Sequence, residues 1–181
     1  SRPIIHHRTA LYQEIFKETV QGLKEILKTQ KSDVFLFASS GTGTMEAAVV
    51  NFCSPGDKVV AVVCGKFGER WEKICRAYGL ETVVLPVTWG ETCDPKKLDG
   101  LLKREEKVKM VFVALCETST GVRNDIESLA KVSHAHGSLI AVDAISGLAA
   151  DPLWTDRWGV DIVVGGSQKA LMLPPGLGLI S

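Results

Sequence analysis

Four short segments of this chain carry side chains that could bind or transform a small molecule. They are Ser40-Gly41-Thr42, Phe67 between two glycines, Asp143, and Gln168-Lys169. Each follows a short run of apolar, often β-branched residues, which is typical of a strand buried in a parallel sheet. In such sheets ligands bind beyond the carboxyl ends of the strands. The four segments are therefore candidates for one shared site.

The segment 39–48 combines glycines and small hydroxyl residues and leads into a predicted helix. The first backbone N–H groups of a helix lack intrahelical partners, and with the helix dipole they can hold an anion. Two common nucleotide motifs do not match, because Glu46 stands where a dinucleotide fingerprint needs its third glycine and no Gly-Lys-Ser/Thr completes a P-loop. The segment predicts an anion cup of another kind, with a plain strand-to-helix turn as the alternative.

Asp143 and Lys169 are the two charged residues at the predicted strand ends. Asp143 could accept a hydrogen bond from a ribose hydroxyl or pair with a protonated ring nitrogen. The alternative is a structural carboxylate that accepts hydrogen bonds from backbone N–H groups. A lysine emerging into a partly desolvated site would have a lowered pKa and could form a Schiff base. The alternative for Lys169 is a solvated surface lysine.

Phe67 and Thr118 complete the set of strand-end candidates. Phe67 could stack on a planar ligand or belong to the core. Thr118 lies in the segment 116–121, which could line a site or form an ordinary hydroxyl-rich turn. Together, an anion cup, an aromatic ring, a carboxylate and a lysine would suit a flat phosphorylated aldehyde that contains a ring nitrogen.

The elements that must position these residues alternate between helices and strands. An amphipathic helix is predicted over 9–29, and seven strands are predicted over 34–38, 58–64, 81–87, 108–115, 138–143, 161–165 and 177–181. Asp94 followed by Pro95 indicates one helix start, and Asn124 with Glu127 resembles a capping box for another. The pattern predicts a three-layer α/β/α fold with a mostly parallel seven-stranded sheet. The short Pro-rich connection 173–176 favours an antiparallel last strand.

Composition reduces the number of function classes that fit this chain. The 181 residues contain 21 Lys and Arg against 21 Asp and Glu, so net charge gives no reason to expect nucleic-acid binding. No apolar run is long enough for a membrane span. The five cysteines form no CxxC and have no histidine at zinc-finger spacing, which predicts reduced core thiols, an intracellular protein and no metal site. The mean hydropathy of +0.13 favours some apolar surface that is covered by another segment or subunit.

Five segments in order along nearly the whole chain give it a close resemblance to one family. They are Ser-Gly-Thr-Gly-Thr-Met-Glu-Ala-Ala (40–48), Glu-Thr-Ser-Thr-Gly-Val (117–122), Val-Asp-Ala-Ile-Ser (142–146), Gly-Ser-Gln-Lys-Ala-Leu (166–171) and Pro-Pro-Gly (174–176). With these segments the chain resembles the class V, fold-type I, pyridoxal-phosphate-dependent aminotransferases. The resemblance is strongest to the alanine–glyoxylate and serine–pyruvate group. It implies an amino transfer from a small amino acid, alanine or serine, to a 2-oxo acid, glyoxylate or pyruvate.

The resemblance also implies a role for each candidate residue. Lys169 would form the Schiff base with pyridoxal 5′-phosphate and move the proton as general acid and base. Asp143 would pair with the pyridine nitrogen and keep it protonated. The remaining cofactor-binding positions are Ser40, Gly41, Thr42 and Gln168 at the phosphate, Phe67 stacking where many relatives have Trp, Thr118 near the 3′-oxygen, and Ile145 against the opposite ring face.

The chain departs from the family pattern at both ends. Residues 1–181 match the cofactor-binding large domain, whereas the N-terminal arm and the C-terminal small domain, which would carry the arginine for the substrate carboxylate, are absent from the printed sequence. We therefore expect a homodimer for the full-length protein, and we expect the isolated chain to associate or aggregate. The cytoplasm is the expected compartment, with peroxisome and mitochondrion left open.

Three alternative functions stay open at this point. A cysteine desulfurase would resemble this fold but usually has His where this chain has Gln168. A catalytically incompetent fragment would keep the fold without turnover. A nucleotide-binding α/β module would use Gly41 and Asp143 for a different ligand.

Overall fold

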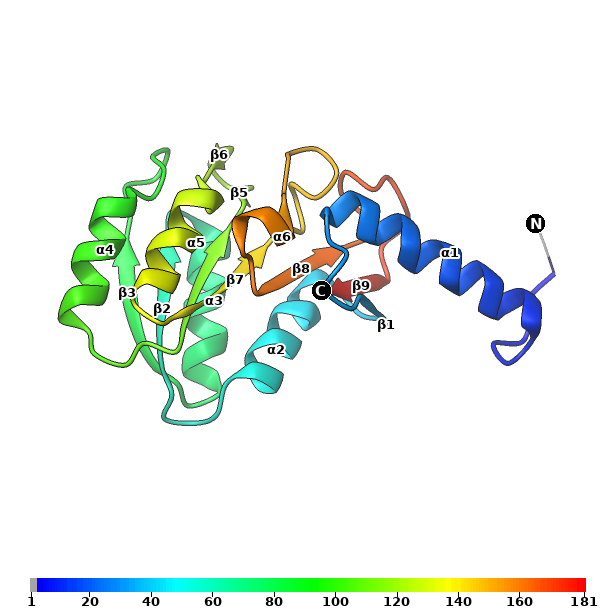
Figure 1. Ribbon diagram of the computed structural model, residues 1–181, viewed down its shortest axis with the longest axis horizontal. Coiled ribbons are helices and arrows are strands. Elements are labelled where there is room, and N and C mark those ends of the chain that lie inside the picture. The colour runs from blue at the N-terminus through cyan, green and yellow to red at the C-terminus, as the bar shows by residue number, and fades with distance from the viewer. Residues whose placement is uncertain (1–2) are drawn as a thin grey trace.

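The computed structural model describes residues 3–181, which form one large sheet between two layers of helices (Figure 1). The helices are α1 (Ala10–Leu27), α2 (Gly41–Phe52), α3 (Lys66–Ala77), α4 (Pro95–Arg104), α5 (Ile126–Ala135) and the short α6 (Thr155–Trp158). The strands of the sheet are β1 (Phe35–Ala38), β2 (Lys58–Val63), β3 (Glu81–Pro86), β4 (Met110–Ala114), β7 (Leu139–Asp143), β8 (Ile162–Gly166) and β9 (Leu177–Ile180). A small separate hairpin pairs β5 (Cys116–Glu117) with β6 (Val122–Arg123).

The strand order of the large sheet is β1-β9-β8-β7-β4-β2-β3. Only β9 is antiparallel to its neighbours β1 and β8, and every other neighbouring pair is parallel. The predicted seven-stranded, mostly parallel sheet with an antiparallel last strand is confirmed. Because β1, β2, β4, β7 and β8 all run in the same direction, their carboxyl ends lie at one edge of the sheet.

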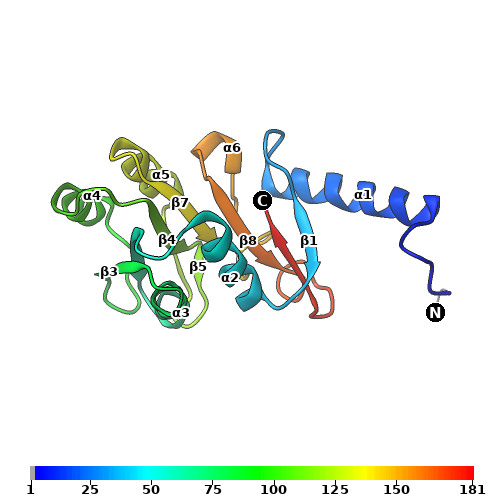
Figure 2. The ribbon, with the colours of Figure 1, turned by 90° about the horizontal axis from the view of Figure 1, so that it is seen from below.

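Two apolar cores cover the two faces of the sheet (Figure 2). Alternate residues of a strand point to opposite faces, so Val60 and Val62 belong to one core while Val59 and Ala61 belong to the other. Residues of α1, α4 and α5 close the first core, and residues of α2 and α3 close the second. This arrangement confirms the predicted three-layer α/β/α fold.

The predicted start of α5 is wrong by one residue. Asp125, not Asn124, caps the helix, because its carboxylate accepts hydrogen bonds from the Ser128 N–H at 3.1 Å and the Ser128 hydroxyl at 2.6 Å. Asn124 is instead buried, and its amide accepts from the Cys93 N–H at 2.9 Å and donates to the Ala114 carbonyl at 2.8 Å. The buried amide joins two segments far apart in the chain, so it is not free to cap the helix.

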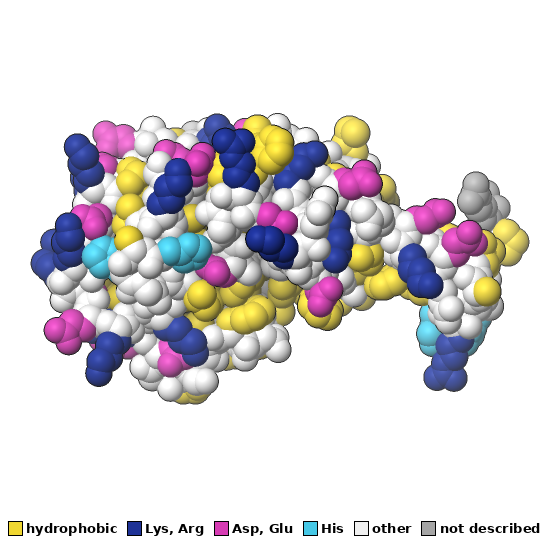
Figure 3. Space-filling model, viewed as in Figure 1, with side chains coloured by type: hydrophobic (Ala, Val, Ile, Leu, Met, Phe, Trp, Pro, Cys, Tyr) yellow, Lys and Arg dark blue, Asp and Glu magenta, His cyan; other side chains and the backbone are white. Residues whose placement is uncertain are grey.

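Helix α1 packs against the sheet with only its C-terminal part, and its N-terminal part extends away from the other elements (Figures 1 and 2). Leu23 and Leu27 are buried, whereas Leu11, Ile15 and Phe16 are exposed. Other hydrophobic side chains lie on the surface below α1, over β1, β9 and α2 (Figure 3). The single chain therefore exposes apolar surface, and the expectation that another segment or subunit covers it stays a prediction. Among residues 3–181, no helix combines the length and hydropathy needed to cross a bilayer.

Candidate functional site

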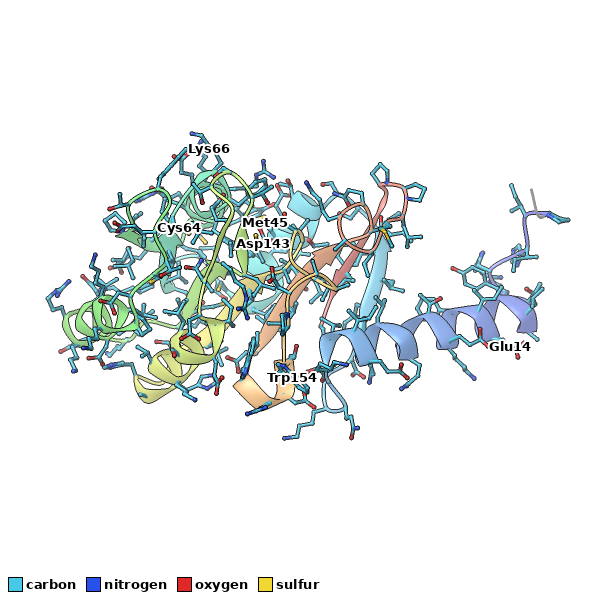
Figure 4. All side chains as sticks on the ribbon, turned by 90° about the horizontal axis from the view of Figure 1, so that it is seen from above. Glu14, Met45, Cys64, Lys66, Asp143 and Trp154 are labelled. Atoms are coloured by element: carbon cyan, nitrogen blue, oxygen red, sulfur yellow. The ribbon has the colours of Figure 1, made fainter. Side chains whose placement is uncertain are left out.

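The predicted site residues lie at or just beyond the carboxyl edge of the sheet. Helix α2 begins three residues after β1, and Phe67 is the second residue of α3, which follows β2. Asp143 ends β7 and lies inside the molecule, whereas Lys66 at the start of α3 lies toward the outside (Figure 4). Lys169 follows β8 by three residues. The topology thus brings these four separate segments of the chain to one edge.

The N-terminus of α2 has the donors of an anion cup. Ser40 is the N-cap; its hydroxyl accepts from the Gly43 N–H at 3.2 Å and its carbonyl accepts from the Thr44 N–H at 3.2 Å. For the N–H groups of Gly41 and Thr42, no hydrogen-bond partner is found within residues 3–181. These two donors, and the positive end of the helix dipole, are available to a negatively charged group.

Ile145 connects the start of α2 with the end of β8. A Cβ atom added to Gly41 would lie 2.6 Å from Ile145 Cδ1, so a larger residue at position 41 would force the Ile145 side chain to move. A Cβ added to Gly166 would lie 3.6 Å from Ile145 Cγ2 and 2.9 Å from Gln168 Oε1. The structure therefore brings Gly41, Ile145 and Gln168 together, as the sequence predicted for one site.

Asp143 is a buried carboxylate with a perturbed affinity for protons. Its side chain is 4% exposed, and Oδ1 accepts the Ile145 N–H at 2.9 Å. Burial raises the pKa of Asp143 to about 6; the hydrogen bond from Ile145 opposes this rise, the negative charge of Glu117 adds to it, and the Arg70 guanidinium opposes it. A cation placed beside Asp143 would favour the ionised form.

Lys169 lies in the loop that joins β8 to β9. Ser167 closes this loop, because its hydroxyl donates to the Pro174 carbonyl at 2.6 Å and its N–H donates to the Leu177 carbonyl at 3.0 Å. The Lys169 side chain is exposed, so the expected partly desolvated surroundings are wrong for this structure. The physical reason is that residues 172–177, which follow it, are themselves exposed and leave the loop uncovered.

The hydroxyl of Thr118 lies beyond β5 and is hydrogen-bonded to the hydroxyl of Ser146. Thr118 is exposed, and Ser146 follows Ile145 in the turn after β7. This contact joins the β5 segment to the segment that carries Asp143. Thr118 thus belongs to the same edge as the other predicted residues.

Glu117 is a structural residue of this edge that the sequence reasoning missed. Its carboxylate is fully buried and accepts the N–H groups of Phe67 at 3.1 Å and Gly68 at 3.0 Å, and the Ser119 hydroxyl at 2.6 Å. The N-cap residue of α3, Gly65, has no side chain, so Glu117 supplies the cap from another segment. A bond across about 50 residues leaves no local signal in the sequence.

Arg70 is a second residue that was missed. Its Nη1 donates to the hydroxyl oxygen of Thr42 at 3.0 Å, and its Cζ lies over the Phe67 ring at 4.7 Å from the centroid. Phe67 and Arg70 are three residues apart on α3 and share a face of the helix. That spacing was a usable signal. In the part of the chain that the structure describes, no group of three His, Cys, Asp or Glu side chains could hold a metal ion.

Three comparisons relate this chain to known proteins, whose names include both aminotransferases and a hydrogenase subunit. The aminotransferase class-V family profile matches residues 2–181. The small subunit of a soluble hydrogenase from Synechococcus is 43% identical over 98% of this chain and 47% of its own length. The L-aspartate–glyoxylate aminotransferase of Paracoccus denitrificans is 38% identical over 98% of this chain and 46% of its own length. A solved alanine–glyoxylate aminotransferase from Nostoc has a TM-score of 0.95 and 28% identity over 99% of this chain and 48% of its own. The chain spans about half the length of these relatives.

Proposed function

The chain belongs to the class-V aminotransferase family, and we propose that residues 1–181 form the cofactor-binding large domain of a transaminase. The proposed reaction moves an amino group from a small amino acid, alanine or serine, to a small 2-oxo acid, glyoxylate or pyruvate. The observation that carries the proposal is the convergence of the α2 N-terminus, buried Asp143 and the Lys169 loop at one sheet edge. The names of the Paracoccus and Nostoc relatives support glyoxylate as the acceptor.

The residues at this edge fit pyridoxal 5′-phosphate. The N–H groups of Gly41 and Thr42, with the Ser40 hydroxyl, would hold the phosphate, while Asp143 would pair with the pyridine nitrogen. Asp143 suits that role because a buried carboxylate with a pKa of about 6 is stabilised by an adjacent positive charge. When bound at this edge, the cofactor would supply an electron-withdrawing ring that stabilises negative charge on the substrate α-carbon.

The side chains around this site then have separate tasks. The Lys169 amine would remove the proton from the substrate α-carbon as general base and deliver it to C4′ of the cofactor as general acid. Phe67 and Ile145 would contact opposite faces of the ring and exclude water. The hydroxyl of Thr118 and the amide of Gln168 would donate or accept hydrogen bonds at the rim. Each task uses a group that its residue type can supply.

Amino transfer can be measured directly. Purified protein, both as the 181-residue chain and extended to the length of its relatives, is mixed with pyridoxal 5′-phosphate, alanine or serine, and glyoxylate. We expect the extended protein to form glycine from glyoxylate and the 181-residue chain alone to form none, because it lacks the arginine expected for the substrate carboxylate. We expect Lys169→Ala to abolish the activity of the extended protein. Lys131→Ala, on an exposed lysine paired with Glu127, is the matched control. Sulfide release from cysteine without amino transfer would favour a desulfurase, and specific nucleotide binding would favour the nucleotide-binding module.

We also propose that the active protein is a homodimer and that it covers apolar surface which is exposed in the single chain. Leu11, Ile15 and Phe16 on α1, and Met172 and Leu173 in the Lys169 loop, support this proposal because large apolar side chains in contiguous segments favour association. Sedimentation of the purified chain tests it. A dimer or larger species is expected, and a stable monomer at micromolar concentration would contradict the proposal.

A further inference from the structure

One cationic side chain links the two helix N-termini at the sheet edge. Arg70, on α3, is partly buried and donates from Nη1 to the Thr42 hydroxyl oxygen at 3.0 Å in the first turn of α2. The same guanidinium lies over the Phe67 ring, with Cζ 4.7 Å from the ring centroid. A planar cation at this distance is attracted by the ring quadrupole. Thr42 and Phe67 are thus fixed relative to each other by one residue.

The direction of the hydrogen bond determines what the Thr42 hydroxyl can do. A guanidinium can only donate, so the Thr42 oxygen accepts, and its single hydroxyl proton remains free to donate elsewhere. The N–H of the same residue also has no partner within residues 3–181. Arg70 therefore leaves Thr42 with two donors for an anion at the α2 N-terminus.

The backbone of Phe67 is held in place as well. The buried Glu117 carboxylate accepts its backbone N–H at 3.1 Å, so the start of α3 cannot move without breaking buried hydrogen bonds. Arg70 covers one face of the Phe67 ring, which leaves the opposite face for a planar ligand. The ring and the anion-binding turn therefore have a set separation.

We propose that Arg70 is a positioning residue for a phosphorylated aromatic ligand: it orients the Thr42 hydroxyl toward the phosphate and holds the Phe67 ring for stacking. The proposal rests on the proposed function for the identity of the ligand. Arg70 acts through Thr42 and Phe67 and does not itself carry out chemistry. Its loss should weaken recognition of the phosphate more than recognition of the ring.

Paired titrations with pyridoxal 5′-phosphate and with pyridoxal, which lacks the phosphate, separate these effects. In Arg70→Gln we expect the affinity for pyridoxal 5′-phosphate to fall about tenfold and the affinity for pyridoxal to fall by less than about threefold, because a charge-assisted hydrogen bond is lost at the phosphate turn. Arg70→Lys keeps the charge and should recover part of the loss. The exposed Arg76, paired with Glu72 on the same helix, provides the control Arg76→Gln, which should bind both ligands normally.

A double-mutant cycle tests whether Arg70 acts through Thr42. Thr42→Val removes the hydroxyl, and we expect Arg70→Gln to weaken phosphate recognition little further in that background. Equal losses for both ligands, unchanged binding in Arg70→Gln, or losses that multiply in the double variant would overturn the proposal.

Inorganic phosphate gives a readout that does not depend on the cofactor. Its addition should shift the amide resonances of Gly41 and Thr42 in the parent protein, and the shift should be smaller in Arg70→Gln. If the parent protein does not bind pyridoxal 5′-phosphate, the proposed function fails, and this experiment still decides the role of Arg70. Equal shifts in the parent and in Arg70→Gln would overturn that role.

Discussion

Two buried carboxylates at the same sheet edge, Glu117 and Asp143, have different hydrogen-bond partners. Glu117 follows β4 and is saturated by protein donors: the N–H groups of Phe67, Gly68 and Ser119 and the Ser119 hydroxyl. Asp143 ends the adjacent strand β7, and the hydrogen bond found for it within residues 3–181 comes from the Ile145 N–H. The first carboxylate stabilises the fold, and the second keeps capacity for a ligand.

This difference shows how burial alone fails to identify a functional residue. A buried charge is tolerated when donors surround it, as at Glu117, and is costly when they do not, as at Asp143. The rise in the Asp143 pKa, which burial causes, expresses that cost. A carboxylate kept in this state is suited to a positively charged partner, which is the role proposed for it beside a ring nitrogen.

The largest expected effect comes from removing the charge of Asp143, the carboxylate with a proposed functional role. Asp143→Asn keeps the size of the side chain but removes the charge, so amino transfer in the full-length enzyme should fall at least about hundredfold. The free energy of unfolding should stay equal or rise, because the cost of the buried charge is gone. Steady-state kinetics and urea unfolding measure the two effects. A variant that retains activity but is strongly destabilised would reverse the assignment.

The second-largest effect comes from removing the charge of Glu117, the carboxylate that caps α3. Glu117→Gln weakens the cap of α3 and places an amide among buried N–H donors, so the free energy of unfolding should fall by about 2–3 kcal/mol. Urea denaturation measures this loss. Glu127→Gln is the control, since Glu127 is paired with Lys131 on the surface of α5 and should cost less than about 0.5 kcal/mol. Equal losses in the two variants would contradict the capping role.

The pH dependence of stability tests the burial of Asp143 in the unmodified protein. The pKa of Asp143 rises from 3.8 in the unfolded chain to about 6 in the folded one, so the folded state binds more protons between these values. Its contribution to stability is therefore greatest below pH 4 and falls by about 2–3 kcal/mol as pH rises to 6. Unfolding of the parent and of Asp143→Asn between pH 4 and 8 should show a difference that changes over this window. A pH-independent difference would contradict the buried-acid assignment.

A smaller effect should follow from removing the cation near Asp143. Arg70 favours the ionised form of Asp143, so Arg70→Gln should move the midpoint of that pH-dependent difference upward by less than about one pH unit. The same unfolding series measures the shift. A midpoint that moves downward would show that Arg70 does not influence Asp143 electrostatically.

The layers and sheet were predictable because they depend on short-range patterns. Apolar runs of five to eight residues separated by amphipathic segments indicate buried parallel strands. All seven predicted strands are present, with ends displaced by at most two residues. The strand-end positions of Gly41, Asp143 and Lys169 followed from the same pattern. Their placement at one edge of the sheet required only the parallel topology.

The contacts that could not be predicted join distant segments. The Glu117 cap on α3 and the Arg70 bond to Thr42 depend on tertiary packing, which leaves no periodic signal. The error at Asn124 has the same cause, because its buried bonds to Cys93 and Ala114 outweigh its local capping preference. The exposure of Lys169 depends on what covers its loop, which residue type and spacing do not show.

The most direct test of the central claim is the site at which the cofactor attaches. Purified protein is incubated with pyridoxal 5′-phosphate, reduced with borohydride, digested, and mapped by mass spectrometry, with Asp143→Asn treated in parallel. We predict that the parent protein is modified at Lys169 in preference to all other lysines, and that labelling of this residue decreases in Asp143→Asn. Modification spread evenly over exposed lysines such as Lys131, with Lys169 no more reactive than the rest, would contradict the assignment of this sheet edge as the cofactor site.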